Sequence, residues 1–547
     1  MATISEIQQK TIDLIDRLKN ITFTHGLGGG GNEYTVLVEM FLYKFLNDKF
    51  VFEAKRVRPE LKQKDNVWEA LNAMGKNEYE QMCDEMRDTI ELHKEHLIPY
   101  LASIQNEPTL AEQFDSVLLD IARTNEEVFF IQNADQTRIP ILKSLSDLVT
   151  GGTSKKNEFC KSLIGAVSGF SFEDAFSAGY DFFSTIFEYL IKDYNANGGG
   201  TYAEYYTPHS IAMIMAKLLV NPDEPVQSVT CYDPSAGTGT LVIALAHYIG
   251  ERNCSIYTQD ISDKSSTMMM LNLILNGMTH SLSHVIQGNT LAAPFHKEKG
   301  KLKRFDYIVS NPPFKLDFSD YRDKLVDDVY KGRFFAGIPK IPNKDKKKME
   351  IYLCFFQHLL YSLSDKGKAA IVVPTGFLTA KSGIAMKIHH YLVDGEHPIL
   401  RGVVSMPSNI FANTGTNVSV VFIDKNQNTD SPIFIDASKM GETVKIDGNQ
   451  KTILSPTEVD TIVKAFREKE IIEDFSVAPT FEEIREKGYS LSAGQYFDIK
   501  IQYEDITAEE FQRRMNGYRE SLVSKFQESR KLEEEIIKQL DNLQFNR

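Results

Sequence analysis

The stretch Asp233-Pro234-Ser235-Ala236-Gly237-Thr238-Gly239-Thr240-Leu241 links two apolar runs, one at residues 229–232 and one that continues to Ile249. The first run has the length of a buried strand, and the second is long enough for a helix. Glycines at such a turn let a ligand approach the backbone closely, and the helix N-terminus offers unpaired N–H groups. The stretch therefore predicts a strand, a ligand-binding turn and a helix.

The alternation of strand and helix continues along the chain. Further strands are predicted at residues 256–258, 284–286, 307–309 and 369–373, and helices at 265–276 and 351–363. Because strands that alternate with helices form parallel sheets, the expected fold class is α/β, with a doubly wound, Rossmann-like sheet. The runs 403–404 and 418–423 have no helix between them, so one is expected to be an antiparallel edge strand or hairpin partner.

Three domains are expected. Residues 1–165 form a helical N-terminal domain, because Ile4, Ile7 and Ile12 begin a helical spacing of apolar residues. Residues 166–430 form the sheet domain, and residues 431–547 form a mixed C-terminal region. A glycine-rich run at 26–32 is either a mobile loop or a segment that orders on a partner or on DNA.

The end of the chain predicts a long amphipathic helix. It begins at Thr507-Ala508-Glu509-Glu510, which has the spacing of a capping box. Its apolar stripe comprises Phe511, Met515, Tyr518, Leu522, Phe526, Leu532, Ile536, Leu540 and Leu543. Such a stripe packs on its own domain or on another protein, and the second reading is preferred. A break near residues 527–530 is left open.

Composition limits the class of protein. The net charge is −14 over 547 residues, which argues against a surface that coats nucleic acid everywhere but permits a local basic patch. No apolar run reaches the roughly 20 residues of a membrane helix, and the N-terminus does not resemble a signal peptide. The five scattered cysteines read as reduced thiols and not as metal ligands. We therefore expect a cytoplasmic protein with no membrane or metal partner.

Ser310-Asn311-Pro312-Pro313-Phe314 follows the strand predicted at 307–309. The two prolines end the strand and hold the backbone in one conformation, so the nearby carbonyls point in set directions. Asn311 offers an amide carbonyl and Phe314 a flat ring. This group of residues is suited to holding a planar base by an amino group on its edge.

The glycine turn favours a nucleoside cofactor. Asp260 ends the next predicted strand, 27 positions after Asp233, where a carboxylate can accept both hydroxyls of a ribose. A dinucleotide site requires a third glycine, and Val242 stands in its place. A cofactor without a pyrophosphate therefore fits better.

These motifs together resemble the S-adenosylmethionine-dependent amino-methyltransferases. With the run Glu204-Tyr205-Tyr206-Thr207-Pro208-His209 ahead of them and helical regions at both ends, the chain resembles the modification subunit of type I restriction–modification systems. The resemblance implies an adenine-N6 DNA methyltransferase with S-adenosylmethionine as cofactor. It makes residues 166–430 the methyltransferase domain.

The resemblance also implies the site residues. The implied cofactor-binding residues are Glu204, Tyr205, Tyr206, Thr207, Pro208, His209, Asp233, Ser235, Ala236, Gly237, Gly239, Asp260 and Asn289. The family more often has Asp where this chain has Asn289. The implied catalytic residues are Asn311, Pro312, Pro313 and Phe314. Thr207 is also expected to cap the helix that follows, with Pro208 in its first turn.

The mechanism follows from the weak nucleophilicity of the adenine amine. Acceptors on both of its N–H bonds, the Asn311 side chain and the Pro312 backbone carbonyl, favour a tetrahedral nitrogen aimed at the methyl group. The base must leave the duplex, and Phe314 would stack on it. A protein-glutamine methyltransferase is the alternative, because an amide nitrogen could use the same site. No cysteine follows a proline, which argues against a cytosine-C5 enzyme.

Two features of the chain indicate its partners: a lysine-rich segment and the lack of an evident target-recognition region. The lysine-rich segment 315–349 is either a solvated loop or a flap that contacts the phosphates of double-stranded DNA. No target-recognition region is evident after residue 430, so a separate sequence-specificity subunit is expected. A restriction or translocase subunit is left open as a third partner.

Overall fold

The computed structural model describes residues 4–29, 31–64, 66–86, 89–133, 137–177, 207–326, 330–394, 397–411, 417–427, 430–446, 449–497 and 506–541. The chain forms two compact units, Met1–Phe497 and Asp498–Arg547. The first unit contains a large sheet with helices on both faces, together with the N-terminal helices. The second unit contains one long helix among its described residues.

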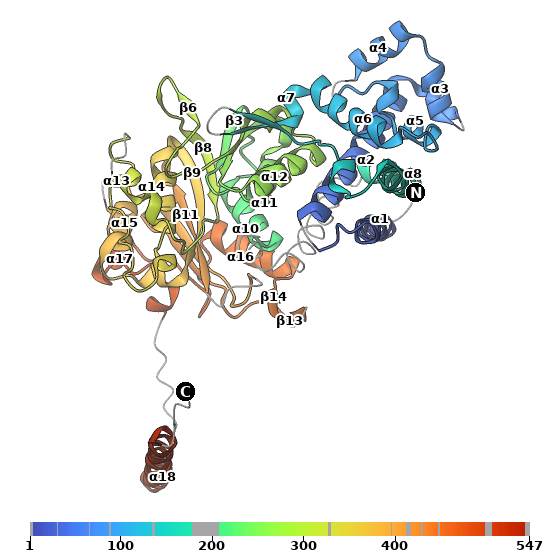
Figure 1. The fold of residues 1–547 in the computed structure, drawn as a ribbon. Helices are drawn as coiled ribbons and strands as arrows, with labels where there is room; N and C mark the ends of the chain where they lie inside the picture. Colours follow the sequence, from blue (N-terminus) through green and yellow to red (C-terminus); the bar gives the residue numbers. More distant parts are fainter. Residues whose placement is uncertain are drawn as a thin grey trace. The chain divides into compact units, whose positions relative to one another are not determined.

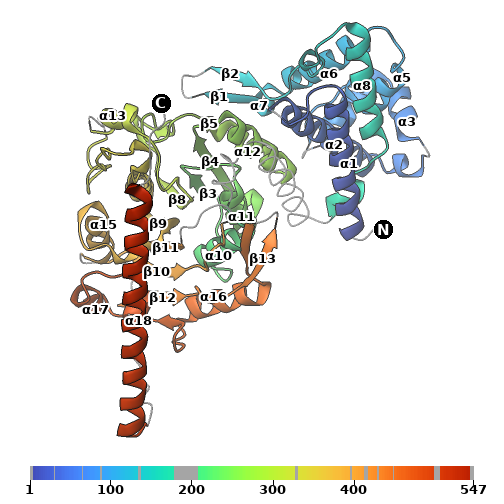
Figure 2. The same cartoon turned by 60° about the horizontal axis from the view of Figure 1, so that its bottom comes forward.

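The centre of the sheet consists of five parallel strands in the order β9, β8, β3, β4, β5 (Figures 1 and 2, with all five labelled in Figure 2). Their bounds are β3 Val229–Asp233, β4 Cys254–Asp260, β5 Val285–Gln287, β8 Phe305–Ser310 and β9 Leu363–Pro374. Each overlaps one of the five predicted strands, with β5 beginning one residue later than predicted, so the predicted parallel sheet is confirmed. The apolar runs form strands here because both of their faces are buried.

The sheet continues beyond β9 through β11 Val418–Asp424, β10 Leu400–Ser405, β12 Ile433–Asp436 and β15 Ser476–Val477. The strand β11 is antiparallel to both β9 and β10, as the missing helix indicated. Neither β10 nor β11 is an edge strand, because β12 and β15 continue the sheet. Residues 430–497, which the sequence pattern left unassigned, thus complete this side of the sheet.

Helices cover both faces of the sheet (Figures 1 and 2). One face carries α10 His209–Leu219, α11 Thr240–Ile249, α12 Asp263–Leu275 and α16 Pro456–Glu468, and the other carries α14 Tyr352–Ser362, α15 Gly383–Val393 and α17 Phe481–Glu486. Alternate residues of β9 separate these layers: Ala370 and Val372 pack in the first core, and Ile371 and Val373 in the second. The doubly wound fold class is therefore confirmed.

Smaller elements complete the sheet region: α13 Arg322–Val326, the hairpin β6 Lys297–Glu298 and β7 Lys301–Leu302, and the hairpin β13 Glu442–Ile446 and β14 Asn449–Ile453.

The N-terminal region is helical, as predicted. Its helices are α1 Ile4–Thr24, α2 Gly31–Val57, α3 Val67–Ala73, α4 Lys76–Glu85, α5 Ile98–Ser103, α6 Leu110–Thr124, α7 Glu126–Phe129 and α8 Thr153–Ser168. A hairpin that was not predicted, β1 Phe130–Asn133 and β2 Arg138–Pro140, extends from it and pairs through β1 with β5. This pairing brings the sheet to eleven strands among the described residues.

The terminal helix α18 runs without interruption from Ala508 to Asp541. The break left open near residues 527–530 is absent, because Gln, Glu and Arg are good helix formers even where the apolar stripe is interrupted. The Thr507 hydroxyl accepts a hydrogen bond from the Glu510 backbone N–H (3.2 Å), so the predicted cap is present.

In the described part of the chain, no helix has both the length and the apolar character needed to cross a membrane.

Candidate active site

Four loops meet at the carboxyl ends of the central parallel strands. Asp233 and Asp260 end β3 and β4, Asn289 follows β5, and Asn311 follows β8. The chain leaves β3 toward β4 on one side and later places β8 on the other side, so β3 lies at the point where the strand order reverses. Ligands of open α/β sheets bind in the crevice at this point.

The turn after β3 requires both of its glycines. Gly237 and Gly239 have positive φ angles of 52° and 87°, which glycine adopts without a steric penalty. A Cβ atom on Gly239 would lie 2.0 Å from the Met269 sulfur. Gly239 is also the N-cap of α11, so the turn brings the backbone of the helix N-terminus to the crevice.

Asp233 lies beneath this turn, and its carboxyl group is 1% exposed. One of its oxygens accepts hydrogen bonds from the Ser235 backbone N–H (2.9 Å) and the Ser235 hydroxyl (3.3 Å). Burial, reinforced by the charge of Asp260, raises the pKa of Asp233 to about 8. The structure thus places Asp233 within its own loop, where it shapes the turn.

Asp260 joins the ends of two strands. Its carboxylate oxygens accept hydrogen bonds from the backbone N–H groups of Gly237 and Ser262, both at 2.9 Å. The side chain is half-buried, and this desolvation raises the pKa of Asp260. Because a carboxylate has about four acceptor positions, two remain for hydroxyl groups of a ligand.

Three hydroxyl groups connect the turn to the neighbouring loops. The hydroxyl oxygens of Ser235 and Ser310 lie 2.7 Å apart and share a hydrogen bond between the turn and the end of β8. The Thr290 hydroxyl donates to the Pro234 backbone carbonyl at 2.7 Å. Ala236, between these contacts, is buried. The cofactor-type turn and the Asn-Pro-Pro-Phe loop are therefore held together directly.

Asn289 has one satisfied and one unsatisfied end. Its side-chain carbonyl accepts a hydrogen bond from the Ala292 backbone N–H at 3.0 Å. Its Nδ2 atom is enclosed and has no hydrogen-bond partner in the described structure. An enclosed donor without a partner costs free energy, which is offset when an acceptor reaches it.

The segment before α10 meets the Asn-Pro-Pro-Phe loop. Glu204, Tyr205 and Tyr206 lie outside the described residues. Thr207 is 6% exposed, and its hydroxyl accepts a hydrogen bond from the Asn311 side-chain nitrogen at 3.0 Å. The prediction that Thr207 caps the helix is wrong.

The helix α10 begins differently from that prediction. Pro208 is its N-cap, no side chain makes a capping hydrogen bond there, and His209 is the first helical residue. Because Thr207 stands one residue before the cap, its hydroxyl is available to Asn311.

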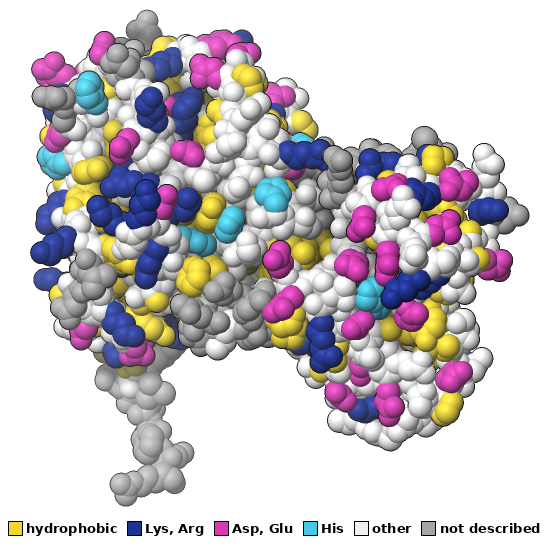
Figure 3. Space-filling view, turned by 90° about the horizontal axis from the view of Figure 1, so that it is seen from above, with side chains coloured by type: hydrophobic (Ala, Val, Ile, Leu, Met, Phe, Trp, Pro, Cys, Tyr) yellow, Lys and Arg dark blue, Asp and Glu magenta, His cyan; other side chains and the backbone are white. Residues whose placement is uncertain are grey.

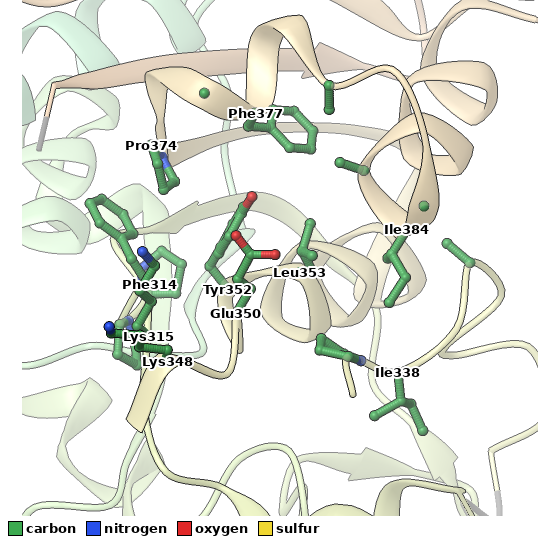
Figure 4. Close-up of a pocket in the computed structure, with 18 of the residues that line it drawn as sticks. Phe314, Lys315, Ile338, Lys348, Glu350, Tyr352, Leu353, Pro374, Phe377 and Ile384 are labelled. Atoms are coloured by element: carbon green, nitrogen blue, oxygen red, sulfur yellow. The ribbon is translucent and has the colours of Figure 1, made fainter. Parts of the chain in front are cut away.

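The Asn311–Phe314 loop lines a cavity of about 1100 Å³. Pro312 is buried, whereas Asn311, Pro313 and Phe314 are partly exposed. The Phe314 ring packs edge-to-face against Tyr352, with 6.3 Å between ring centroids. Figure 4 shows Phe314 and Lys315 on one side of the cavity and Ile338 and Ile384 on the other. The cavity is large enough for a nucleotide.

Basic side chains surround this cavity. Lys315, Lys340 and Lys348 line it and are exposed. In the space-filling view, Lys and Arg side chains gather at the left of the surface (Figure 3). Arg333, from the same segment, is instead buried, donates to the Leu291 carbonyl at 2.7 Å and stacks on Phe334. The expected basic surface is therefore built from lysines, and Arg333 supports the fold.

Much of the basic segment is folded around a small core. Phe318, Leu325, Met349, Ile351, Cys354 and Phe355 are buried together in one cluster. Its described residues therefore have a packed interior, and the reading of the segment as a solvated loop does not describe them.

A second polar cluster, far away in the sequence, has a structural explanation. His93, His96 and Asp120 lie close enough to hold a cation. The His96 Nδ1 atom, however, accepts the His93 backbone N–H (3.1 Å), so Nε2 carries the ring proton and donates it to Asp120 (2.7 Å). Neither ring nitrogen of His96 then has a lone pair for a metal. The buried imidazole joins α6 to the segment before α5.

Sequence reasoning assigned no role to four residues of this region. Thr290 and Ser310 hold the loops together, and Tyr352 and Phe411 line the cavity. Ser310 was quoted only as the first residue of the Asn-Pro-Pro stretch, although a hydroxyl at that position can bond to a neighbouring loop. The aromatic residues belong to ordinary apolar runs, so only the fold brings them to the site.

The chain is similar to known proteins in sequence and in fold. A family model described as N-6 DNA Methylase matches residues 178–505. The chain is 27% identical over 417 residues to the type I restriction enzyme MpnII methylase subunit of Mycoplasma pneumoniae, covering 74% of this chain and 73% of that protein. It is 24% identical over 516 residues to the MjaVIII methylase subunit of Methanocaldococcus jannaschii, covering 92% and 82%.

A solved structure has a similar fold. The methyltransferase subunit of a type I restriction-modification system from Streptococcus thermophilus superimposes with a TM-score of 0.70 at 22% identity, covering 91% of this chain and 100% of that one. None of these matches favours the protein-glutamine alternative.

Proposed function

This chain belongs to the N-6 DNA methylase family, and from that premise we propose that it transfers a methyl group from S-adenosylmethionine to N6 of adenine in DNA. The resemblance predicted from the motifs is confirmed at the level of the family. The observation that carries the proposal is the Asn311 side chain at the cavity. Its nitrogen donates to Thr207, and its carbonyl, which has no hydrogen-bond donor among the described residues, can accept from an amino group.

The residues of the crevice fit S-adenosylmethionine. Asp260 has acceptor positions left for ribose hydroxyls, Asn289 has an enclosed donor without a partner among the described residues, and Gly239 turns the backbone at the N-terminus of α11 toward the crevice. We assign Ser235, Ala236 and Gly237 to the same site, and with them the motif Glu204–His209, as the resemblance implies. When bound, the cofactor supplies a methyl group already activated on a sulfonium.

The protein then has to make the adenine amine nucleophilic. Its lone pair is delocalised into the ring until the Asn311 side chain and the Pro312 carbonyl accept its two N–H bonds. Held in this way, the nitrogen would be tetrahedral with its lone pair available to the methyl group that the sulfonium would give up, and it would afterwards release its extra proton to solvent. Proline at positions 312 and 313 holds these acceptors before the substrate arrives, which lowers the cost of reaching the transition state.

The cavity receives the base outside the duplex. Adenine inside a base pair cannot place its amine against Asn311 within the cavity, so the nucleotide must rotate out. Phe314 offers a face for stacking, and Tyr352 supports that ring from the side. The lysines at the cavity would contact the phosphates of the displaced strand, which reconciles DNA binding with a net charge of −14.

The proposal includes a separate specificity subunit as partner. The apolar side chains of α18 are 47–68% exposed, and a helix with such a stripe is stable in water when another helix covers it. We assign α18 to that contact. We keep residues 1–165 as the N-terminal part and 166–430 as the part with the site motifs, whereas residues 431–497 of the C-terminal region complete its sheet. A restriction or translocase subunit could join the same complex. A cytoplasmic location accords with five free thiols.

The test uses the chain purified with the specificity subunit encoded beside it. Tritium from labelled S-adenosylmethionine should appear in duplex DNA as N6-methyladenine and not in protein. Replacing Asn311 with Ala should lower the rate of transfer by about 100-fold or more, with unchanged affinity for S-adenosylhomocysteine. Label in protein glutamine, or undiminished transfer by Asn311→Ala, would contradict the proposal.

A further inference from the structure

The Asn311 side chain must face one way for the proposed reaction. Its carbonyl and amino ends have nearly the same shape, but only the carbonyl can accept the N–H of an adenine amine. If the amide turned over, two N–H donors would face each other and the nucleophile would be repelled. Some neighbouring group must therefore favour one orientation.

We infer that Thr207 is the positioning residue that holds Asn311 in its productive orientation, an inference that rests on the proposed function. The Asn311 Nδ2 atom donates to the Thr207 hydroxyl oxygen over 3.0 Å, and the carbonyl end makes no hydrogen bond within the described part of the chain. Thr207 is 6% exposed, so water does not readily replace it as the acceptor.

The backbone around Thr207 holds its hydroxyl in place. Pro208 restricts the conformation of the residue before it, and Pro208 also begins α10, whose buried side chains pack in the first core. No capping hydrogen bond competes for the hydroxyl. The acceptor is therefore attached to a rigid helix and not to a loose loop.

The other side of the Asn311 backbone is held independently. Ser310, the preceding residue, is fully buried and shares a hydrogen bond with Ser235 at 2.7 Å. Pro312 restricts the backbone on the following side. With the backbone held on both sides, rotation of the amide group is the main freedom left, and Thr207 acts on that freedom.

The Thr207 hydroxyl can donate a hydrogen bond as well as accept one. While it accepts from Asn311, its own proton is available for another acceptor. A ligand that takes this proton prevents the hydroxyl from donating to Asn311, and so stabilises the orientation in which Nδ2 faces Thr207. Cofactor binding and the orientation of the catalytic amide are thereby coupled through one oxygen atom.

Two substitutions separate this role from packing. Thr207→Val keeps the shape of the side chain and removes the hydroxyl, whereas Thr207→Ser keeps the hydroxyl and removes a methyl group. In the assembled complex, Thr207→Val should lower the single-turnover rate of methyl transfer by about 10- to 100-fold. Thr207→Ser should retain most of the rate.

The controls make each outcome decisive. Thr22→Val removes the hydroxyl of another buried threonine, which donates to the Lys19 carbonyl, and should leave the rate unchanged. Melting temperature and the affinity for S-adenosylhomocysteine are measured for every variant.

The inference is overturned if Thr207→Val keeps the full rate, or if Thr207→Ser falls as far as Thr207→Val. It is also overturned if the loss follows cofactor affinity alone, because Thr207 would then act only as a cofactor contact. Absence of methyl transfer to adenine by the unaltered complex would instead refute the proposed function, so the two failures are distinguishable.

Discussion

At the scale of single residues, the site depends on contacts between loops that are distant in the sequence. Thr207 and Asn311 are 104 positions apart, and Ser235 and Ser310 are 75 apart. The motifs themselves could be recognised from their order, because each needs particular residue types at a turn. Their mutual contacts could not, because a hydroxyl before a proline is equally suited to capping a helix.

Asp233 gives a prediction about pH. Its pKa in the folded protein, about 8, lies above its ordinary 3.8, so the folded state holds the proton more strongly than the unfolded state. The free energy of unfolding therefore falls as pH rises from about 4 to 8, by up to about 1.4 kcal/mol per pH unit. Asp233→Asn keeps the oxygen that accepts from Ser235 and should remove this contribution.

Urea unfolding at several pH values in this range, for both proteins, measures the difference. As pH rises, the free energy of unfolding of the unaltered chain should fall relative to that of Asp233→Asn. A gap that stays constant would contradict the raised pKa.

Gly239 gives a second prediction, for which the chain offers a matched control. Gly239→Ala must adopt a positive φ and also displaces Met269, whereas Gly277→Ala meets a positive φ of 72° with open space around it. The control should lose about 1–2 kcal/mol of stability from the backbone alone. Gly239→Ala should lose about 1–3 kcal/mol more from overpacking, together with cofactor affinity.

Chemical denaturation and calorimetric titration of S-adenosylhomocysteine measure both effects. Equal losses for the two variants would show that the close approach to Met269 has no energetic consequence.

At the scale of elements, the pattern of apolar residues was sufficient to predict a helix or strand wherever that element packs against elements close to it in the sequence. The strand–turn–helix unit around residue 240 is the clearest case, because α11 has the predicted bounds. The hairpin β1–β2 was missed because its few residues show no alternation and form a strand only by pairing with a distant β5. Residues 430–497 were left unassigned although they contain α16, because the short strands around that helix, β12 and β15, form only by joining the sheet at β10.

The helix α18 gives the prediction at this scale. Tyr518 and Leu522 are 68% and 55% exposed and lie four positions apart on one face. The double change Tyr518→Ser and Leu522→Ser should abolish co-purification with the specificity subunit. It should leave the melting temperature of the isolated chain unchanged, because neither side chain is buried there.

Arg519→Ser, on a neighbouring face of the same helix, serves as the control and should co-purify normally. A double variant that still binds the partner would remove α18 from the proposed interface.

At the scale of the whole molecule, positive charge is concentrated at the cavity although the net charge is negative. The chain is acidic overall, yet the cavity carries Lys315, Lys340 and Lys348. The sequence indicated this concentration of lysines but could not tell which side chains face outward, as buried Arg333 illustrates.

Replacing these three lysines with Ala should weaken DNA binding by the complex and flatten its dependence on salt. The slope of log affinity against log salt should fall by about 0.9 for each phosphate contact removed. Alanine at Lys62, Lys76 and Lys464, which do not line the cavity, should change neither quantity. Fluorescence anisotropy over a range of salt concentrations provides both values, and equal slopes for the two triple variants would contradict the phosphate role.

The join between β1 and β5 has a consequence for how the first unit opens. Two residue pairs form this join, whereas five pairs connect β3 with β4. Local opening follows the least protected contacts, so the strand contributed by the N-terminal helices should separate while the central strands remain closed. In native-state hydrogen exchange, amides of β1 should therefore exchange sooner than those of β3, as the edge of a separate cooperative unit.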